Sequence, residues 1–251
     1  MKTFRVMLKT ELKLSLRGMD MLIFAIIMPL VVLLIIGMIF GGKPAFEGAE
    51  YTFLDQSFGA LATISICAGG VMGLPLVVSD YRGRKILKRF RATPVSPAMI
   101  LIVQVAIYTL YSAISLIFLY LTANMFFGFQ MRGSFVHFLG GYILVIFSMF
   151  SLGMMVGGIA PDTKSAGVIA SLLYFPMLIF SGATLPYEIM PPAFQTVANV
   201  LPLTQGIKIL KAACLGLPPE NAAVPALIMA ALAVIRRHTK FMQYDWKRKN
   251  T

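Results

Sequence analysis

The stretch from Ala98 to Phe127 reads AMILIVQVAIYTLYSAISLIFLYLTANMFF and contains no Asp, Glu, Lys or Arg. At about 1.5 Å per residue, a helix of this length exceeds the roughly 30 Å hydrocarbon core of a bilayer, yet it is too short for two crossings and a turn. We therefore expect one helix that tilts or projects into water. Of the 251 residues, 58% are hydrophobic and only 13% are charged, against about 25% charged in soluble domains. The sequence predicts a helical membrane protein and excludes an ordinary soluble domain and a disordered chain.

Further apolar segments accompany this run and predict six spans in total. Because backbone groups in lipid must be satisfied within their own segment, each span should be helical. The last segment is the weakest, since its 14 residues fall below the usual minimum of about 17 for a crossing. Two Gly-x-x-x-Gly spacings, at 69–73 and 153–157, permit close contact between helices, although this signal is weak in glycine-rich spans. The predicted spans are residues 21–40, 58–79, 98–127, 135–160, 165–183 and 222–235.

The orientation of the spans follows from the 22 Lys and Arg residues. Eighteen of them lie before residue 20, in the loops after spans two and four, or in the tail after Ile235, and four lie in the other three loops. By the positive-inside rule, both termini should face the cytoplasm. This asymmetry supports the short sixth span, because without it the basic tail would lie outside. The net charge of +12 is thus a topology signal, and since no DNA- or RNA-binding motif accompanies it, we expect no nucleic-acid partner.

Residues 1–20 show the pattern of an amphipathic helix. Apolar and basic residues each recur at every fourth position, which places them on two neighbouring faces. Such a helix should lie in the cytoplasmic interface, with its apolar face in lipid and its basic face toward anionic headgroups, so membrane lipid is an expected partner. The apolar set is Phe4, Leu8, Leu12 and Leu16, and the basic set is Arg5, Lys9, Lys13 and Arg17.

The loop between spans two and three reads DYRGRKILKRFRATPVSP over residues 80–97. Its part from 84 to 91 suits a short helix with apolar residues along one side, and the two prolines that follow stop this helix before span three. A basic loop helix usually does no more than set topology. The apolar side and the proline-bounded length indicate, in addition, that this segment docks on another protein.

The segment 184–215, between spans five and six, is rich in proline. Pro191-Pro192 can open a short helix and Pro202 can end it, after which a second helix can run to Leu215. Because these stretches are apolar yet lie between two spans, we expect them to dip back into the outer leaflet as a re-entrant element. A purely extracellular loop is the alternative, since proline also punctuates loops.

The sequence lacks the residue patterns expected of ion coupling, catalysis, metal binding or nucleotide binding on this chain. None of the six predicted spans contains a charged residue, which disfavours a proton- or sodium-coupled transporter, although backbone carbonyls can also bind sodium. No HExxH motif and no Cys/His cluster with metal-ligand spacing occurs, so we expect no catalytic residue and no metal. Residues 37–43 read GMIFGGK, but Pro44 stands where a phosphate-binding loop needs Ser or Thr, so we expect no nucleotide cofactor on this chain.

A line of polar residues follows one face of the third predicted span. Gln104, Tyr108, Tyr111 and Ser115 recur at spacings of four, three and four, so they share a face. That face can line an amphipathic cavity or contact a second subunit. The simpler expectation is that these side chains make hydrogen bonds between helices.

The order of these parts resembles a known family. An amphipathic helix and two spans precede the basic segment, four spans follow it, and the last two flank SGATLPYEIMPPAFQTVANVLPLTQGIKILKAACLG over residues 181–216. Over nearly the whole chain, this arrangement resembles the bacterial type-2 ABC-transporter permeases, the membrane subunits of ABC exporters for drugs, lipids and polysaccharides. Two motifs carry the resemblance: KRFRATPVSP at 88–97, and the Leu-Pro pairs at 185–186 and 201–202.

The resemblance implies partners and roles. Two six-span permeases would pair as a homo- or heterodimer, with a cavity between them lined mainly by spans two and five. Separate ATP-binding cassette ATPase subunits, which hold the ATP and magnesium, would bind a coupling helix at 82–91, and the N-terminal helix would lie beside it. The implied coupling residues are Arg82, Arg84, Lys85, Ile86, Leu87, Lys88, Arg89, Phe90 and Arg91. The implied outer gate, within 184–215, comprises Leu185, Pro186, Pro191, Pro192, Leu201, Pro202, Leu203 and Thr204.

We therefore expect a non-catalytic permease of the bacterial inner membrane that exports a hydrophobic or amphipathic cargo, such as a drug or lipid, with energy from ATP. A polysaccharide-export permease of the same family is one alternative. An ATP-independent channel or scaffold is another, and it would tolerate charge reversal of Arg89 and Arg91. Two features depart from the family pattern: many relatives have an acidic residue near Lys88, and most have a fuller sixth span than the one that Arg236 and Arg237 end here.

Overall fold

The structure, a computed structural model, describes residues 2–40, 42–45, 48–86, 96–181, 191–218 and 224–231. Within these ranges the regular structure is helical, apart from one antiparallel bridge between Pro44 and Thr52, so the predicted all-helical class is confirmed. Residues 224–231 are also helical. The named helices are α1 (Lys2–Gly18), α2 (Asp20–Leu22), the π-helical turn η1 (Ile23–Ile27), α3 (Met28–Phe40), α4 (Phe53–Cys67), the π-helical turn η2 (Ala68–Gly73), α5 (Leu74–Gly83), α7 (Pro97–Phe127), α8 (Phe135–Ile159), α9 (Thr163–Phe180), α10 (Pro192–Val200) and α11 (Pro202–Leu215).

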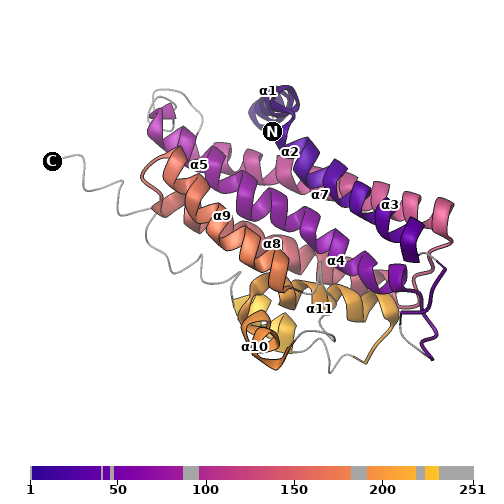
Figure 1. Cartoon of the computed structure of the whole chain (residues 1–251). Coiled ribbons are helices and arrows are strands. Elements are labelled where there is room, and N and C mark those ends of the chain that lie inside the picture. The colour runs from indigo at the N-terminus through magenta and orange to yellow at the C-terminus, as the bar shows by residue number, and fades with distance from the viewer. Residues whose placement is uncertain are drawn as a thin grey trace.

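Five helical stretches are long and apolar enough to cross a membrane, and they coincide with the first five predicted spans. They lie side by side in Figure 1, with α1 at one edge of the bundle and α10 at the opposite edge. The short helix at 224–231 falls inside the predicted sixth span, and a sixth crossing stays a prediction. The five stretches are Ile23–Phe40, Phe53–Gly83, Ala98–Phe127, Phe135–Ile159 and Thr163–Phe180.

The second span is longer than the predicted 58–79 and carries charge at both ends. Its first turn is fixed by a capping box, in which the Thr52 hydroxyl accepts a hydrogen bond from the Asp55 amide at 3.1 Å and the Asp55 carboxylate accepts one from the Thr52 amide at 2.9 Å. Asp55 is buried in this turn, and Asp80 and Arg82 lie in the last turn of α5. The predicted stretch 58–79 itself contains no charge, and the charged residues lie where the helix extends beyond it at each end.

Glycines allow α8 to pack directly against η2 and α5. A side chain at Gly153 would place its Cβ 1.7 Å from the Gly70 carbonyl oxygen, and one at Gly157 would place it 2.8 Å from the Cβ of Val78. No larger residue fits where two helix backbones approach this closely. The spacing at 153–157 therefore marks a real helix contact.

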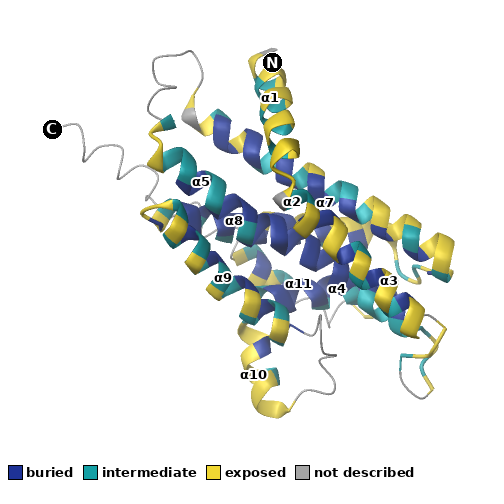
Figure 2. Ribbon diagram, turned by 45° about the horizontal axis from the view of Figure 1, so that its top comes forward, coloured by how far each residue is buried: buried dark blue, intermediate teal, exposed yellow. Residues whose placement is uncertain are grey.

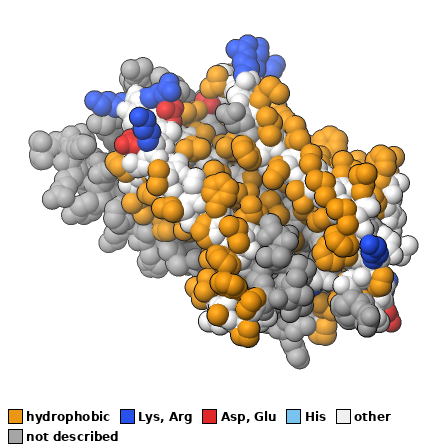
Figure 3. All heavy atoms as spheres, in the orientation of Figure 1, with side chains coloured by type: hydrophobic (Ala, Val, Ile, Leu, Met, Phe, Trp, Pro, Cys, Tyr) orange, Lys and Arg blue, Asp and Glu red, His pale blue; other side chains and the backbone are white. Residues whose placement is uncertain are grey.

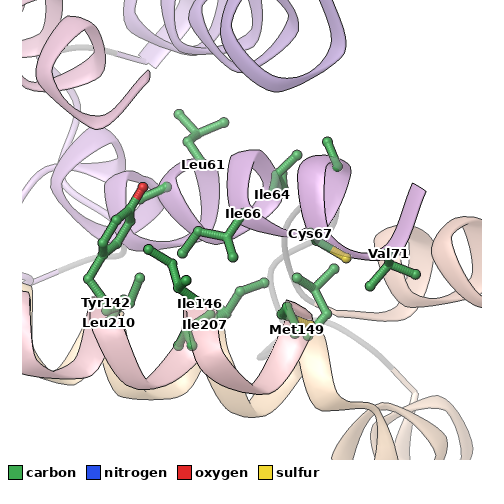
Figure 4. Close-up of a cluster of buried hydrophobic side chains, with 14 of the residues drawn as sticks. Leu61, Ile64, Ile66, Cys67, Val71, Tyr142, Ile146, Met149, Ile207 and Leu210 are labelled. Atoms are coloured by element: carbon green, nitrogen blue, oxygen red, sulfur yellow. The ribbon is translucent and has the colours of Figure 1, made fainter. Parts of the chain in front are cut away.

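The hydrophobic core lies where α4 and η2 meet α8 and α11. In Figure 4, Ile66 and Cys67 of α4 face Ile146 and Met149 of α8, and Ile207 of α11 lies beside them. Figure 2 shows the same contrast across the fold, with buried residues along α4 and α8 and exposed ones along α3 and α9. In the second span 83% of the most apolar window is buried, against 28% in the first span and 22% in the fifth. The second span is thus the centre of this chain, and the first and fifth present apolar surface outward.

The outer surface has the distribution of side chains expected of a membrane protein. On the face drawn in Figure 3, apolar side chains cover the long helices, and most of the basic side chains gather at the end of the bundle near α1 and α5. Large exposed side chains such as Met38, Met125 and Leu172 are the ones that lipid or another subunit would cover. This surface agrees with the hydropathy of the sequence.

Candidate functional site

The last turn of α5 joins three helices through one carboxylate. The Tyr81 hydroxyl donates a hydrogen bond to Glu11 Oε2 of α1 at 2.6 Å, and the Gln104 amide nitrogen of α7 donates to the same oxygen at 2.9 Å. The Gln104 nitrogen also lies 3.1 Å from the Tyr81 hydroxyl. Hydrogen bonds to a charged, partly buried acceptor are stronger than neutral ones, so this cluster fixes α1 against the second and third spans.

Arg82, the next residue, points to a different helix. Its Nη1 donates to the carbonyl oxygens of Gly157 at 2.8 Å and Ala160 at 3.1 Å, and it also contacts the carbonyl oxygen of Gly158. The last carbonyls of a helix have no partner within the helix, and a cation near them complements the helix dipole. Arg82 therefore caps the C-terminal end of α8.

The turn after α8 is fixed on its other side as well. Asp162 precedes α9, and its carboxylate accepts a hydrogen bond from the Ser165 amide at 2.7 Å. This hydrogen bond is the main reason why the pKa of the exposed Asp162 carboxyl is lowered from its ordinary value. The short turn between α8 and α9 is thus capped by Arg82 at its beginning and by Asp162 at its end.

The predicted coupling residues fall only in part within the described residues. Arg82 was expected in a loop helix, but α5 continues to Gly83, and this places Arg82 in the span helix with its side chain half-buried against α8. Arg84 is exposed and forms an ion pair with Asp80 at 2.8 Å, and Lys85 is exposed with a φ of 56°. Ile86 is half-buried. The other members of the set, Leu87, Lys88, Arg89, Phe90 and Arg91, lie outside the described residues.

The apolar face of α1 packs in part on protein, and its position in the cytoplasmic interface stays a prediction. Phe4, Leu8 and Leu12 are half-buried against the core, and α1 contacts α7. Leu16 is 45% exposed. Four residues turn a helix by about 400°, so each step of four drifts by about 40° and Leu16 lies about 120° from Phe4. The four residues therefore do not share one face. All members of the basic set, Arg5, Lys9, Lys13 and Arg17, are exposed.

Glu11 was missed by the sequence analysis. It follows Phe4 by seven residues and Leu8 by three, and this spacing places it on the same face as both. A carboxylate on an otherwise apolar, packed face needs a hydrogen-bond donor, and this requirement was the available signal. The face has a second polar contact, because the Tyr111 hydroxyl donates to the Ser15 hydroxyl at 2.8 Å.

The polar line along the third span is buried inside the chain and does not line an open cavity. The exposed fraction is 4% for Gln104, 2% for Tyr108 and Tyr111, and 0% for Ser115. Gln104 and Tyr111 hydrogen-bond to α1, and the Tyr108 ring packs over Gly73. This face of the third span therefore makes contacts with neighbouring helices. The Ser115 hydroxyl is buried and has no hydrogen-bond partner among the described residues.

Replacing Glu11 by alanine should release α1 from the bundle. The change removes the shared acceptor and leaves the Tyr81 hydroxyl and the Gln104 amide with one partner fewer in a partly buried site, at a cost of about 1–3 kcal/mol in the free energy of unfolding. Glu11→Gln retains an acceptor oxygen and should retain most of the stability. The measurement is thermal unfolding of the detergent-solubilised protein, with the exposed Lys9→Ala on the opposite face as control. Equal unfolding midpoints for Glu11→Ala and Lys9→Ala would contradict the role of Glu11.

The predicted outer gate contains two helices bounded by proline. Pro192 is the first residue of α10 and Pro202 is the first residue of α11, with Leu201 between the two helices. Leu203 and Thr204 are buried at the start of α11. The helices therefore begin and end where the prolines predicted. Pro191 lies just before α10, and Leu185 and Pro186 lie outside the described residues.

α11 lies antiparallel to α4 and in direct contact with it. A Cβ at Gly59, near the start of α4, would lie 2.8 Å from the backbone nitrogen of Lys211. A Cβ at Gly206 would lie 3.0 Å from the methyl carbon of Thr63, further along α4. Near its C-terminal end α11 meets the turn before α8, where the Gly133 amide donates to the Cys214 carbonyl at 2.9 Å. α11 thus begins beside the interior of the second span and ends beside the turn that joins spans three and four.

The family of this chain follows from a comparison with known protein families. The family model described as ABC-2 type transporter matches residues 2–215. The chain belongs to the ABC-2 type transporter family. It is a multi-pass protein of the bacterial inner membrane, as the resemblance of its basic segment and proline-rich segment implied.

Curated members of the family are similar to part of this chain. Nodulation protein J of Rhizobium leguminosarum bv. viciae is 34% identical over 85 residues, which cover 34% of this chain and 33% of the relative. The inner membrane transport permease YhhJ of Escherichia coli (strain K12) is 29% identical over 85 residues, which cover 34% of this chain and 23% of the relative. The matched stretch thus spans about a third or less of the length of these relatives. No solved structure matches the chain.

Proposed function

We propose that this ABC-2 family member is the permease subunit of an ATP-driven exporter that moves a hydrophobic or amphipathic, drug- or lipid-like substrate out of the cytoplasm. The observation that carries the proposal is the end of α5: the most buried of the described spans ends at the exposed basic residues Arg84 and Lys85, just before the basic stretch of the sequence, and its last turn binds α1 through Tyr81 and Glu11. A buried central helix that emerges as a basic segment is suited to receive force from another protein.

The energy would come from a separate ATP-binding cassette ATPase, which holds ATP and magnesium. No group of three or more His, Cys, Asp or Glu among the described residues is arranged to hold a metal ion. Binding of ATP would draw two ATPase subunits together and move the basic segments that rest on them. The spans would then shift from an inward-open to an outward-open arrangement, and substrate would leave past α10 and α11.

A second permease chain would complete the pathway. One face of α9 carries large apolar side chains at spacings of four, three and four, and each of them is at least half exposed. This stripe, together with the exposed α3, is the apolar surface that a second chain and lipid would share. The residues of the stripe are Val168, Leu172, Phe175 and Ile179.

The test is to purify the tagged chain from membranes in mild detergent and to measure bound ATPase and its activity. We expect a stoichiometric ATPase subunit for the wild type, and loss of that subunit or of its coupling in the double variant Arg89→Glu/Arg91→Glu, since reversal of two positive charges opposes the same docking surface. The double variant Lys247→Glu/Lys249→Glu, in the basic tail, is the matched control. Normal efflux by the Arg89/Arg91 variant would favour an ATP-independent channel and contradict the proposal.

A further inference from the structure

We propose that Tyr81 and Arg82, named here the α5 junction, transmit movement of the basic segment to two separate parts of the bundle: Tyr81 to α1 and α7, and Arg82 to α8. Arg82 then acts as a positioning residue and does not itself bind the ATPase. This inference rests on the proposed function, because it requires a partner that moves the segment after α5.

The position of the α5 junction allows one movement to reach both α1 and α8. Successive residues on a helix point about 100° apart, so the two neighbouring side chains leave α5 in different directions. The Tyr81 hydroxyl binds Glu11 at 2.6 Å, and Arg82 Nη1 binds the end of α8 at 2.8 Å from the Gly157 carbonyl oxygen. A rotation or shift of the last turn of α5 must therefore act on both contacts at once.

The connection from Arg82 to α8 is rigid enough to carry such a shift. The guanidinium is planar and its donors have fixed directions, so several carbonyl contacts hold it in one orientation. Close packing supports it, since a Cβ at Gly157 would already lie 3.0 Å from Pro75 in α5. Beyond Ala160 the chain makes only a short turn before Asp162 caps α9. Movement of α8 at this point therefore continues into α9, the span with the smallest buried share.

Two neighbouring arginines show that inward orientation is specific to Arg82. The Arg84 side chain is 72% exposed and pairs only one turn back, with Asp80 on the same helix. The Arg82 side chain is half-buried and reaches the carbonyls of α8, more than 70 residues away in sequence. Of these two, Arg84 is the one directed toward a partner outside the chain.

The experiment measures amide hydrogen exchange by mass spectrometry in the complex of the full chain with its ATPase, in lipid nanodiscs. It is done with and without a non-hydrolysable ATP analogue. In the wild type, we expect nucleotide to change exchange in α1 and in residues 156–165 together. Arg82→Gln should raise exchange in 156–165 about tenfold or more without nucleotide, since a charge-assisted cap is lost, and should abolish the nucleotide response there. Lys164→Gln, which removes an exposed charge from the same turn, is the control.

Each arm of the α5 junction is tested separately. Tyr81→Phe removes only the hydroxyl, so it should abolish the response in α1 and leave the response in 156–165, and Arg82→Lys should restore part of that second response. An unchanged nucleotide response of 156–165 in Arg82→Gln would overturn the inference. If Arg82→Gln fails to insert, loss of the 156–165 response in Tyr81→Phe would overturn it instead. Absence of any ATPase from the wild-type complex would overturn the proposed function as well, whereas a bound ATPase with unchanged responses overturns the inference alone.

Discussion

Gly153→Ala should destabilise the protein by about 3 kcal/mol or more, because the added methyl group has no space to occupy. Its Cβ would lie 1.7 Å from the Gly70 carbonyl oxygen and 3.3 Å from Pro75. The Gly70 oxygen belongs to backbone and cannot rotate away as a side chain would. Either α8 or η2 must move, and the core described around Cys67 and Met149 would open. The measurement is the midpoint of thermal unfolding in detergent, together with the yield of monodisperse protein.

The same helix offers a matched control for this substitution. A Cβ at Gly140 meets nothing within 4 Å, so Gly140→Ala should be neutral or stabilising by up to about 1 kcal/mol, the usual preference of a helix for alanine over glycine. Similar unfolding midpoints for Gly140→Ala and Gly153→Ala would show that the α8 contact with η2 is looser than described.

Gly133→Ala should detach the end of α11 while leaving the rest of the fold in place. Its Cβ would lie 1.9 Å from the Ala213 carbonyl oxygen and 2.9 Å from the Gly216 nitrogen, so the backbone contact that includes the Gly133 amide and the Cys214 carbonyl must separate. Cys214 is fully buried in the wild type. We expect its thiol to react with a maleimide at least tenfold faster in the variant.

The second native thiol makes this result specific. Cys67 is also fully buried, but it lies at the end of α4 in the core, so it should stay unreactive if only α11 is released. Gly42→Ala, in a loop position where a Cβ meets nothing within 4 Å, is the control for a methyl group added outside the helices. Simultaneous labelling of Cys67 and Cys214 would instead indicate general unfolding, and no labelling of Cys214 would contradict the tight contact at Gly133.

Hydropathy and proline positions predicted most of the fold because both act locally. A charge-free stretch such as 98–127 must be helical in lipid wherever it packs, and a proline at position 192 or 202 starts a helix whatever lies beside it. The residues at which the second span begins and ends were harder to predict from the sequence. Charged residues usually mark the end of a span, but Asp55 stabilises the first turn of the helix because it completes a capping box. Arg82 remains in the helix because the carbonyl oxygens at the end of α8 accept its hydrogen bonds.

Residues of the candidate site were harder to predict because their roles depend on partners distant in sequence. Glu11 and Tyr81 are 70 positions apart, and nothing near either one indicates the other. The polar line of Gln104 and Tyr111 was recognised as one face, but sequence alone does not say whether water, a second subunit or α1 covers it. The drift of about 40° at each step of four explains why Leu16 was assigned to the wrong face of α1.

The π-helical turns η1 and η2 lie in contact, one in the first span and one in the second. A π turn accommodates one residue more than a regular turn, so it resets the direction in which every later side chain leaves the helix by about 100°. Ser65, just before η2, donates its hydroxyl to the Ala25 carbonyl in η1 at 2.5 Å, which links the two irregular turns. The direction in which Tyr81 and Arg82 leave the helix toward their partners is thus set by a single extra residue some ten positions earlier in the same helix. Loss of any one residue between positions 68 and 73 would leave the composition and hydropathy of the span almost unchanged, yet it would turn both side chains away from α1 and α8.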